Sequence, residues 1–168
     1  TGAVIFSYQT EKKEESESET KKRIEFHDIV VVGTEKGLKA YDLLDGAGLW
    51  TAECGAPATG LAAGDRIVAC VNESGHLVVM SARNGKIGYR VPGADPVSTP
   101  VIAEDKILYL SKSGDIRMLE VFGGSRRTEL WMRAKWLGKA VAPLTGADSH
   151  MFYATDRKGL ICAKPSRR

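Results

Sequence analysis

The chain has 168 residues, of which 43% are apolar, enough to build the core of one domain or of a fragment of a larger protein. Its 24 basic and 21 acidic residues leave a net charge of only +3, with a pI near 8.7. A nucleic-acid-binding protein concentrates Lys and Arg on one face, whereas much of the charge here lies in a mixed run at 11–23 and a short basic tail at 164–168. We therefore expect a solvated surface and no nucleic-acid partner.

The three cysteines, Cys54, Cys70 and Cys162, are odd in number and show no CxxC spacing. Cys70 and Cys162 lie in apolar runs, which favours small buried side chains over metal ligands. A disulfide would require two of the three to meet in the fold. The sequence has no apolar run long enough to span a membrane and no signal peptide, but it does not begin with Met, so the compartment stays open.

Self-similarity is the main feature of the sequence. Four short apolar runs each end in a polar turn and a glycine, at Gly37, Gly75, Gly114 and Gly159, with spacings of 38, 39 and 45 residues. The acidic residues that precede these runs, which we expect in turns, are Asp28, Asp65, Asp105 and Asp148. A four-stranded unit with a period of about 40 residues is typical of one blade of a β-propeller.

The repeat divides the chain into four units, at about 23–53, 60–91, 97–133 and 140–164. The last unit lacks a fourth strand, whereas residues 1–9 resemble such a strand. We therefore expect the first strand, at about 3–9, to complete the last blade, as propellers commonly hide their open sheet edges in this way. The predicted fold is all-β, a propeller of four four-stranded repeat units.

A charged run, EKKEESESETKKR at 11–23, stands where the other units have a short connection. It is too polar to bury apolar surface, which predicts a flexible, solvated loop. Binding of a charged partner is the alternative interpretation of this segment.

The clearest local pattern is the hairpin AYDLLDGAGLW at 40–50, where Asp45-Gly46 favours a tight turn because glycine accepts a positive φ. Its residues Ala40, Asp42, Gly46 and Trp50 resemble the tryptophan-docking motif of PQQ-like (pyrroloquinoline-quinone-like) β-propellers, A-x-D-x-x-x-G-x-x-x-W. The resemblance implies that these residues pack neighbouring blades together and do no chemistry.

Weaker copies of the motif follow, and they cover nearly the whole chain. In the second unit Gly85 and Tyr89 match, while Val79 and Ser81 depart from the motif. The residues that match in the last two units are Gly123 or Gly124 with Trp131, and Ala163 with Gly2 and Phe6.

The resemblance also implies about eight blades, while this chain carries four. The chain would then close as a monomeric four-bladed ring, form a homodimer with eight blades, or be half of an eight-bladed ring in a longer protein. Enzymes of the family use pyrroloquinoline quinone with calcium, an Asp base and a Trp platform, a set that we do not find here. Non-enzymatic members include an outer-membrane assembly lipoprotein, which favours a periplasmic or extracytoplasmic location.

Catalytic and metal-binding patterns are weak. His27, His76 and His150 fall at strand ends or turns with scattered spacing, which favours solvated histidines over a metal cluster. Cys162 has no evident His partner, and the chain contains no GxSxG, P-loop or dinucleotide fingerprint. We expect no catalytic, metal-binding or cofactor-binding residues.

One run mixes basic and aromatic residues in the connection to the last unit. Trp136 fits no motif position and lies near Arg133, Lys135 and Lys139, which predicts an interaction hot spot. The alternative is that Trp136 covers the apolar seam between blades. The sequence thus favours a non-enzymatic propeller scaffold that binds a protein or peptide; the alternative is half of a quinone-dependent dehydrogenase whose site forms on dimerisation.

Overall fold

The computed structural model describes residues 3–12, 23–58, 60–64, 66–95, 98–103, 106–121, 128–133, 137–139, 141–142, 144–147 and 150–163. The strands within these residues form four antiparallel sheets. This confirms the predicted fold class at the level of an all-β protein built from four sheets.

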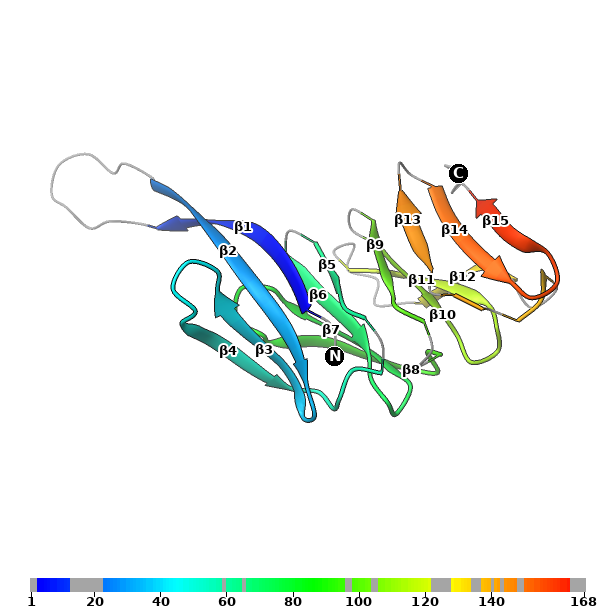
Figure 1. Cartoon of the computed structure of the whole chain (residues 1–168), viewed down its shortest axis with the longest axis horizontal. Helices are drawn as coiled ribbons and strands as arrows, with labels where there is room; N and C mark the ends of the chain where they lie inside the picture. The colour runs from blue at the N-terminus through cyan, green and yellow to red at the C-terminus, as the bar shows by residue number, and fades with distance from the viewer. Residues whose placement is uncertain are drawn as a thin grey trace, which may run out of the picture.

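Each sheet is a meander in which strands adjacent in sequence pair with one another (Figure 1). The first sheet consists of β1 (Ala3–Lys12), β2 (Arg23–Thr34), β3 (Gly37–Asp42) and β4 (Gly48–Glu53). The second consists of β5 (Ala62–Ala63), β6 (Ile67–Val71), β7 (His76–Ser81) and β8 (Ile87–Pro92). The third consists of β9 (Val101–Ala103), β10 (Lys106–Leu110), β11 (Ile116–Glu120) and β12 (Thr128–Met132). The described strands of the fourth are β13 (Thr145–Ala147), β14 (His150–Thr155) and β15 (Gly159–Ala163).

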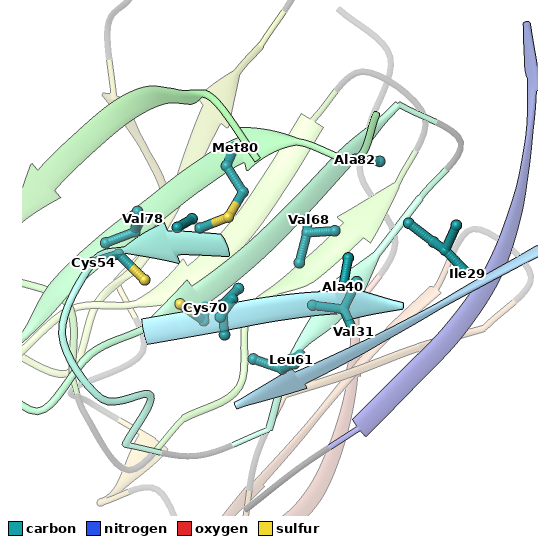
Figure 2. Close-up of a cluster of buried hydrophobic side chains, with 12 residues drawn as sticks. Ile29, Val31, Ala40, Cys54, Leu61, Val68, Cys70, Val78, Met80 and Ala82 are labelled. Carbon is teal, nitrogen blue, oxygen red and sulfur yellow. The ribbon is translucent and has the colours of Figure 1, made fainter. Parts of the chain in front are cut away.

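The sheets follow one another along an arc, with the first and the fourth at its two ends (Figure 1). Their first strands contact in succession, β1 with β5, β5 with β9 and β9 with β13. The core is therefore divided into three clusters, each lying between two consecutive sheets. Figure 2 shows the first cluster, in which Ile29, Val31 and Ala40 of the first sheet meet Val68 and Met80 of the second.

The strand β6 shows why the strands of these sheets appear in the sequence as short apolar runs. All five of its residues are buried, because alternate side chains enter the cluster on each face of the second sheet. Val68 and Cys70 face the first sheet, whereas Ala69 and Val71 face the third.

The structure corrects the predicted place of the first strand. β1 does not complete the last blade: it pairs with β2 along its whole length, with Phe6 opposite Ile29. Phe6 therefore does not occupy the motif position of the fourth unit. The physical reason is sequence distance, since closing a short hairpin costs less conformational entropy than pairing with a strand some 150 residues away.

The same hairpin corrects two other expectations. Glu11 and Lys12 lie at the end of β1, and Arg23 begins β2, so the charged segment 11–23 is not a loop over its full length. Asp28, which we expected in a turn, lies within β2, opposite Ser7. Residues 13–22 lie outside the described part of the chain.

Candidate functional site

Trp50 joins the first two sheets through a contact with Gly85. The indole Nε1 donates a hydrogen bond of 2.9 Å to the buried carbonyl oxygen of Ala82. Gly85 has φ +67°, and a Cβ there would lie 2.6 Å from Trp50 Cε3. The tryptophan of one unit therefore packs on the motif glycine of the next.

The second unit repeats this contact with a different aromatic residue. The Tyr89 hydroxyl donates a hydrogen bond of 2.8 Å to the carbonyl oxygen of Val121 in the third unit. Both bonds join residues 32 positions apart, Trp50 with Ala82 and Tyr89 with Val121. The indole and the phenol thus serve as equivalent donors.

The motif turns are held by the backbone. Asp42 N bonds Ala47 O, and Gly46 N bonds Asp42 O; in the second unit the bonds from Ser81 N to Lys86 O and from Gly85 N to Ser81 O repeat this pattern. The Asp42 carboxylate adds one bond, accepting from Leu44 N at 2.7 Å. The departure from the motif at Ser81 therefore leaves the turn intact.

The remaining motif residues are placed as follows. Ala40 is buried opposite Trp50 in the β3–β4 pair. Trp131 lies in β12 and is half-buried against the third core cluster. Gly2, Gly123 and Gly124 lie outside the described residues.

The structure describes half of the predicted interaction patch. Arg133 and Lys139 are exposed, and Lys135 and Trp136 lie outside the described residues. The backbone of Lys139 is fixed by Asp156, whose carboxylate Oδ1 accepts from Lys139 N at 2.8 Å and whose N donates to Lys139 O at 3.1 Å. The patch as a hot spot stays a prediction.

A groove between the second and third sheets was not predicted. It has a volume of about 360 Å³, and its apolar lining includes Ile67, Val79, Met80, Ile87, Tyr89 and Val121. The lining comes from β6, β7 and β8 and from the residue after β11, so no local sequence signal marks it.

The charged side chains that line this groove, within the part of the chain that the structure describes, are the exposed Arg66 and Lys86. The exposed ammonium group of Lys86 therefore places positive charge at the opening of a groove with an apolar floor. This arrangement suits a ligand with an apolar anchor and a negative charge.

The two ends of the arc form a second kind of surface. Asn72 and Ser111 directly follow β6 and β10, and Thr155 is the last residue of β14. The residue five positions later is Leu77, Ile116 or Leu160. Leu77 and Ile116 are fully buried against the next sheet, whereas Leu160 is 71% exposed. The outer face of the fourth sheet thus carries apolar residues at positions that earlier sheets bury.

Cys162 lies on β15, the strand that also carries Leu160. Its side chain is exposed, which corrects the expectation that it is buried. On the neighbouring strand β14, the side chains of Phe152 and Ala154 are half-buried. At the opposite end of the arc, β4 of the first sheet carries Leu49 at 42% exposure. We call these surfaces the two end faces.

Tyr153 carries a buried polar group with no partner. Its hydroxyl makes no hydrogen bond, although the residue is only 1% exposed. Burial raises the pKa of the Tyr153 phenol, and the charges of Asp95 and Asp156 raise it further. The side chain is therefore neutral at physiological pH and belongs to the third core cluster.

The described residues do not fit the calcium ion that quinone enzymes of this fold use. Calcium takes six to eight oxygen ligands, several of them carboxylates. In the described ranges, no three His, Cys, Asp or Glu residues gather closely enough to hold a metal. We derive no quinone chemistry for this chain.

Among the described residues, no helix is long and apolar enough to cross a membrane.

The motif, the repeating contacts and the four sheets define a class, the PQQ-like β-propeller repeat proteins. The family model PQQ_2, described as outer membrane protein assembly factor BamB, matches residues 34–158. The chain therefore belongs to this family. None of the curated proteins matches the chain.

Three solved structures share the fold. The computationally designed Ika4 protein has a TM-score of 0.62 and 17% identity, over 82% of this chain and 86% of its own. BamB from Moraxella catarrhalis has a TM-score of 0.56 and 18% identity, over 82% and 45% of the two chains. The Cps50 (Swd1) β-propeller domain from Myceliophteria thermophila has a TM-score of 0.64 and 12% identity, over 81% and 48%. The chain thus spans about half the length of these two natural proteins.

Proposed function

We propose that this chain is a non-enzymatic propeller scaffold that binds a protein or peptide segment in the groove between its second and third sheets. The observation that carries the proposal is the groove itself, with its apolar floor and the exposed, cationic Lys86 at its rim. An acidic segment with one apolar side chain is the ligand that this chemistry recognises.

The recognition is divided between two parts of the ligand. The apolar side chain gains by leaving water against Tyr89 and Val121, which line the groove. The acidic flanks meet Lys86, whose backbone N is held by Asn84 Oδ1 at 3.1 Å. Because this contact is at the rim, it contributes orientation and association rate more than affinity.

The family supplies the context of the proposal. The matching model is described as an outer membrane protein assembly factor. We therefore propose that the chain lies outside the cytoplasm and that its partner is a protein that takes part in outer-membrane protein assembly. The predicted patch at Arg133, Lys135, Trp136 and Lys139 is a second contact in this proposal.

The test uses two fluorescent peptides, each with one leucine anchor, flanked by aspartates in one and by lysines in the other. We expect the purified chain to bind the aspartate peptide and not the lysine peptide in fluorescence anisotropy. Lys86→Glu should weaken this binding about fivefold to tenfold, because one rim charge contributes about 1 kcal/mol.

Lys39→Glu is the matched control, since Lys39 is an exposed residue of β3 in the first sheet and does not line the groove. Equal binding of the two peptides, or equal weakening by both substitutions, would contradict the groove as the binding site. The effect of Lys86→Glu should also shrink as salt is added, since salt screens an exposed charge.

A further inference from the structure

Cys54 and Cys70 lie in contact between the first two sheets. Cys54 directly follows β4, and Cys70 is in the middle of β6. Both belong to the first core cluster, at 2% and 0% exposure. Figure 2 shows that their sulfur atoms point toward each other.

The backbone around Cys54 is held on both sides of the sheet boundary. Its N donates to Lys36 O at 3.2 Å in the first sheet, and its carbonyl accepts from Asn72 Nδ2 at 2.8 Å in the second. Cys70 is fixed by its pairing with Val78 in the β6–β7 ladder. These bonds hold the backbone of both cysteines in place at the boundary between the two sheets.

The two thiols differ in acidity, which suits thiol–disulfide exchange. The contact with Cys70 lowers the pKa of Cys54 despite burial, and Arg90 lowers it further. Arg90 is held nearby by a bond of 2.9 Å from its Nη2 to Glu53 O. The same contact and burial raise the pKa of Cys70, so Cys54 is the thiol that becomes the nucleophile.

We propose that Cys54 and Cys70 form a disulfide that links the first blade to the second. The oxidant is an external disulfide, either a small molecule or a protein. The Cys54 thiolate attacks one of its sulfurs, and one external thiol leaves with the proton that Cys54 lost. Cys70 then attacks the sulfur of Cys54, and the second external thiol leaves with the proton of Cys70. Two electrons pass in all from the cysteine pair to the oxidant.

Access to Cys54 needs only a local opening, because its neighbours Glu53 and Gly55 are exposed and Cys54 lies just beyond the end of β4. The link also suits an extracytoplasmic compartment, where disulfides persist. The inference does not depend on the groove or its ligand.

The experiment uses Cys162→Ser, which removes the exposed third thiol. The protein is equilibrated with reduced and oxidised glutathione in varied ratio, quenched with acid, unfolded and alkylated. We expect the two alkylation sites to be lost together in the monomer as the oxidised fraction rises. Closing a loop with 15 residues between its ends should raise the Tm by about 5–10 °C relative to the reduced protein.

Trypsin locates the link without any substitution, which covers the case in which Cys162→Ser fails to fold. Cleavage after Lys39, Arg66 and Arg83 places Cys54 in peptide 40–66 and Cys70 in peptide 67–83. We expect these two peptides to be joined in oxidised protein and separated by reductant. Cys54→Ala in the Cys162→Ser background should show neither the joined peptides nor the rise in Tm.

Full alkylation of both sites at every ratio would overturn the proposal, because it would mean that the pair is only packing. Joined peptides found only in covalent dimers would also overturn it. So would a lower Tm in the oxidised protein, since that would show that the native packing does not accommodate the bond.

Discussion

Gly85 combines two separate demands at one position. Its φ of +67° disfavours any side chain, and the indole of Trp50 fills the space where a Cβ would lie. Gly46 has a similar φ of +73° in the equivalent turn of the first unit, but nothing lies within 4 Å of its Cβ position. The pair therefore separates the conformational role of a motif glycine from its role in docking.

We expect Gly85→Ala to lower the free energy of unfolding by about 3 kcal/mol and Gly46→Ala by about 1 kcal/mol. Both substitutions cost free energy because they place a side chain on a left-handed backbone, and only Gly85→Ala also displaces Trp50. Urea unfolding followed by tryptophan fluorescence measures the difference. Equal losses for the two variants would show that the contact between Trp50 and Gly85 contributes nothing beyond backbone strain.

At the scale of elements, Asn72 holds two sheets together with one side chain. Its Nδ2 donates to Cys54 O at 2.8 Å, and its Oδ1 accepts from His76 N at 2.9 Å. Thr155 repeats the first contact in the fourth sheet, donating from Oγ1 to Leu137 O at 2.8 Å, again across 18 residues. A polar side chain at this position therefore ties the hairpin to the segment that precedes it in the second and fourth sheets, whereas Ser111 of the third sheet donates to Asp115 O within its own turn.

Asn72→Ala should lower the free energy of unfolding by about 2–3 kcal/mol, because it leaves the carbonyl of buried Cys54 without this donor. Asn84→Ala is the control, since Asn84 Oδ1 accepts from Lys86 N in an exposed turn and its loss should cost less than about 1 kcal/mol. Chemical denaturation compares the two. Similar costs would mean that the contact between the sheets does not depend on Asn72.

The sequence predicted the repeat and its turns because both are local. Asp45-Gly46 specifies a turn with two neighbouring residues, and the hairpin glycines recur at a nearly fixed spacing. The pairing partner of β1 could not be predicted this way. A short apolar strand can pair with the open edge of any sheet, so its sequence does not specify that the partner is β2. The groove was missed for a related reason: Val121 and Ile87 approach each other only through the packing of two sheets.

At the scale of the whole molecule, the arc leaves two end faces, and the one on the fourth sheet resembles the faces buried inside it. Leu160 stands at the position that Leu77 and Ile116 fill in the interior, yet it is 71% exposed. The opposite end face presents Leu49, at 42% exposure. A sheet of a second copy can cover each end face, as the next sheet covers the equivalent face of an interior sheet within the chain. Head-to-tail contacts at both ends would then close a ring.

We therefore expect light scattering on a sizing column to give twice the chain mass of 18.2 kDa. Leu160→Asp should reduce the mass to that of one chain, because a carboxylate buried against an apolar sheet has no partner to offset its lost hydration. Leu44→Asp is the matched control, since Leu44 is 92% exposed in the turn after β3 and lies outside the strands of both end sheets. A wild-type mass near that of one chain would contradict association through the end faces, and a loss of the dimer in both variants would mean that general solubility, and not the end face, controls the mass.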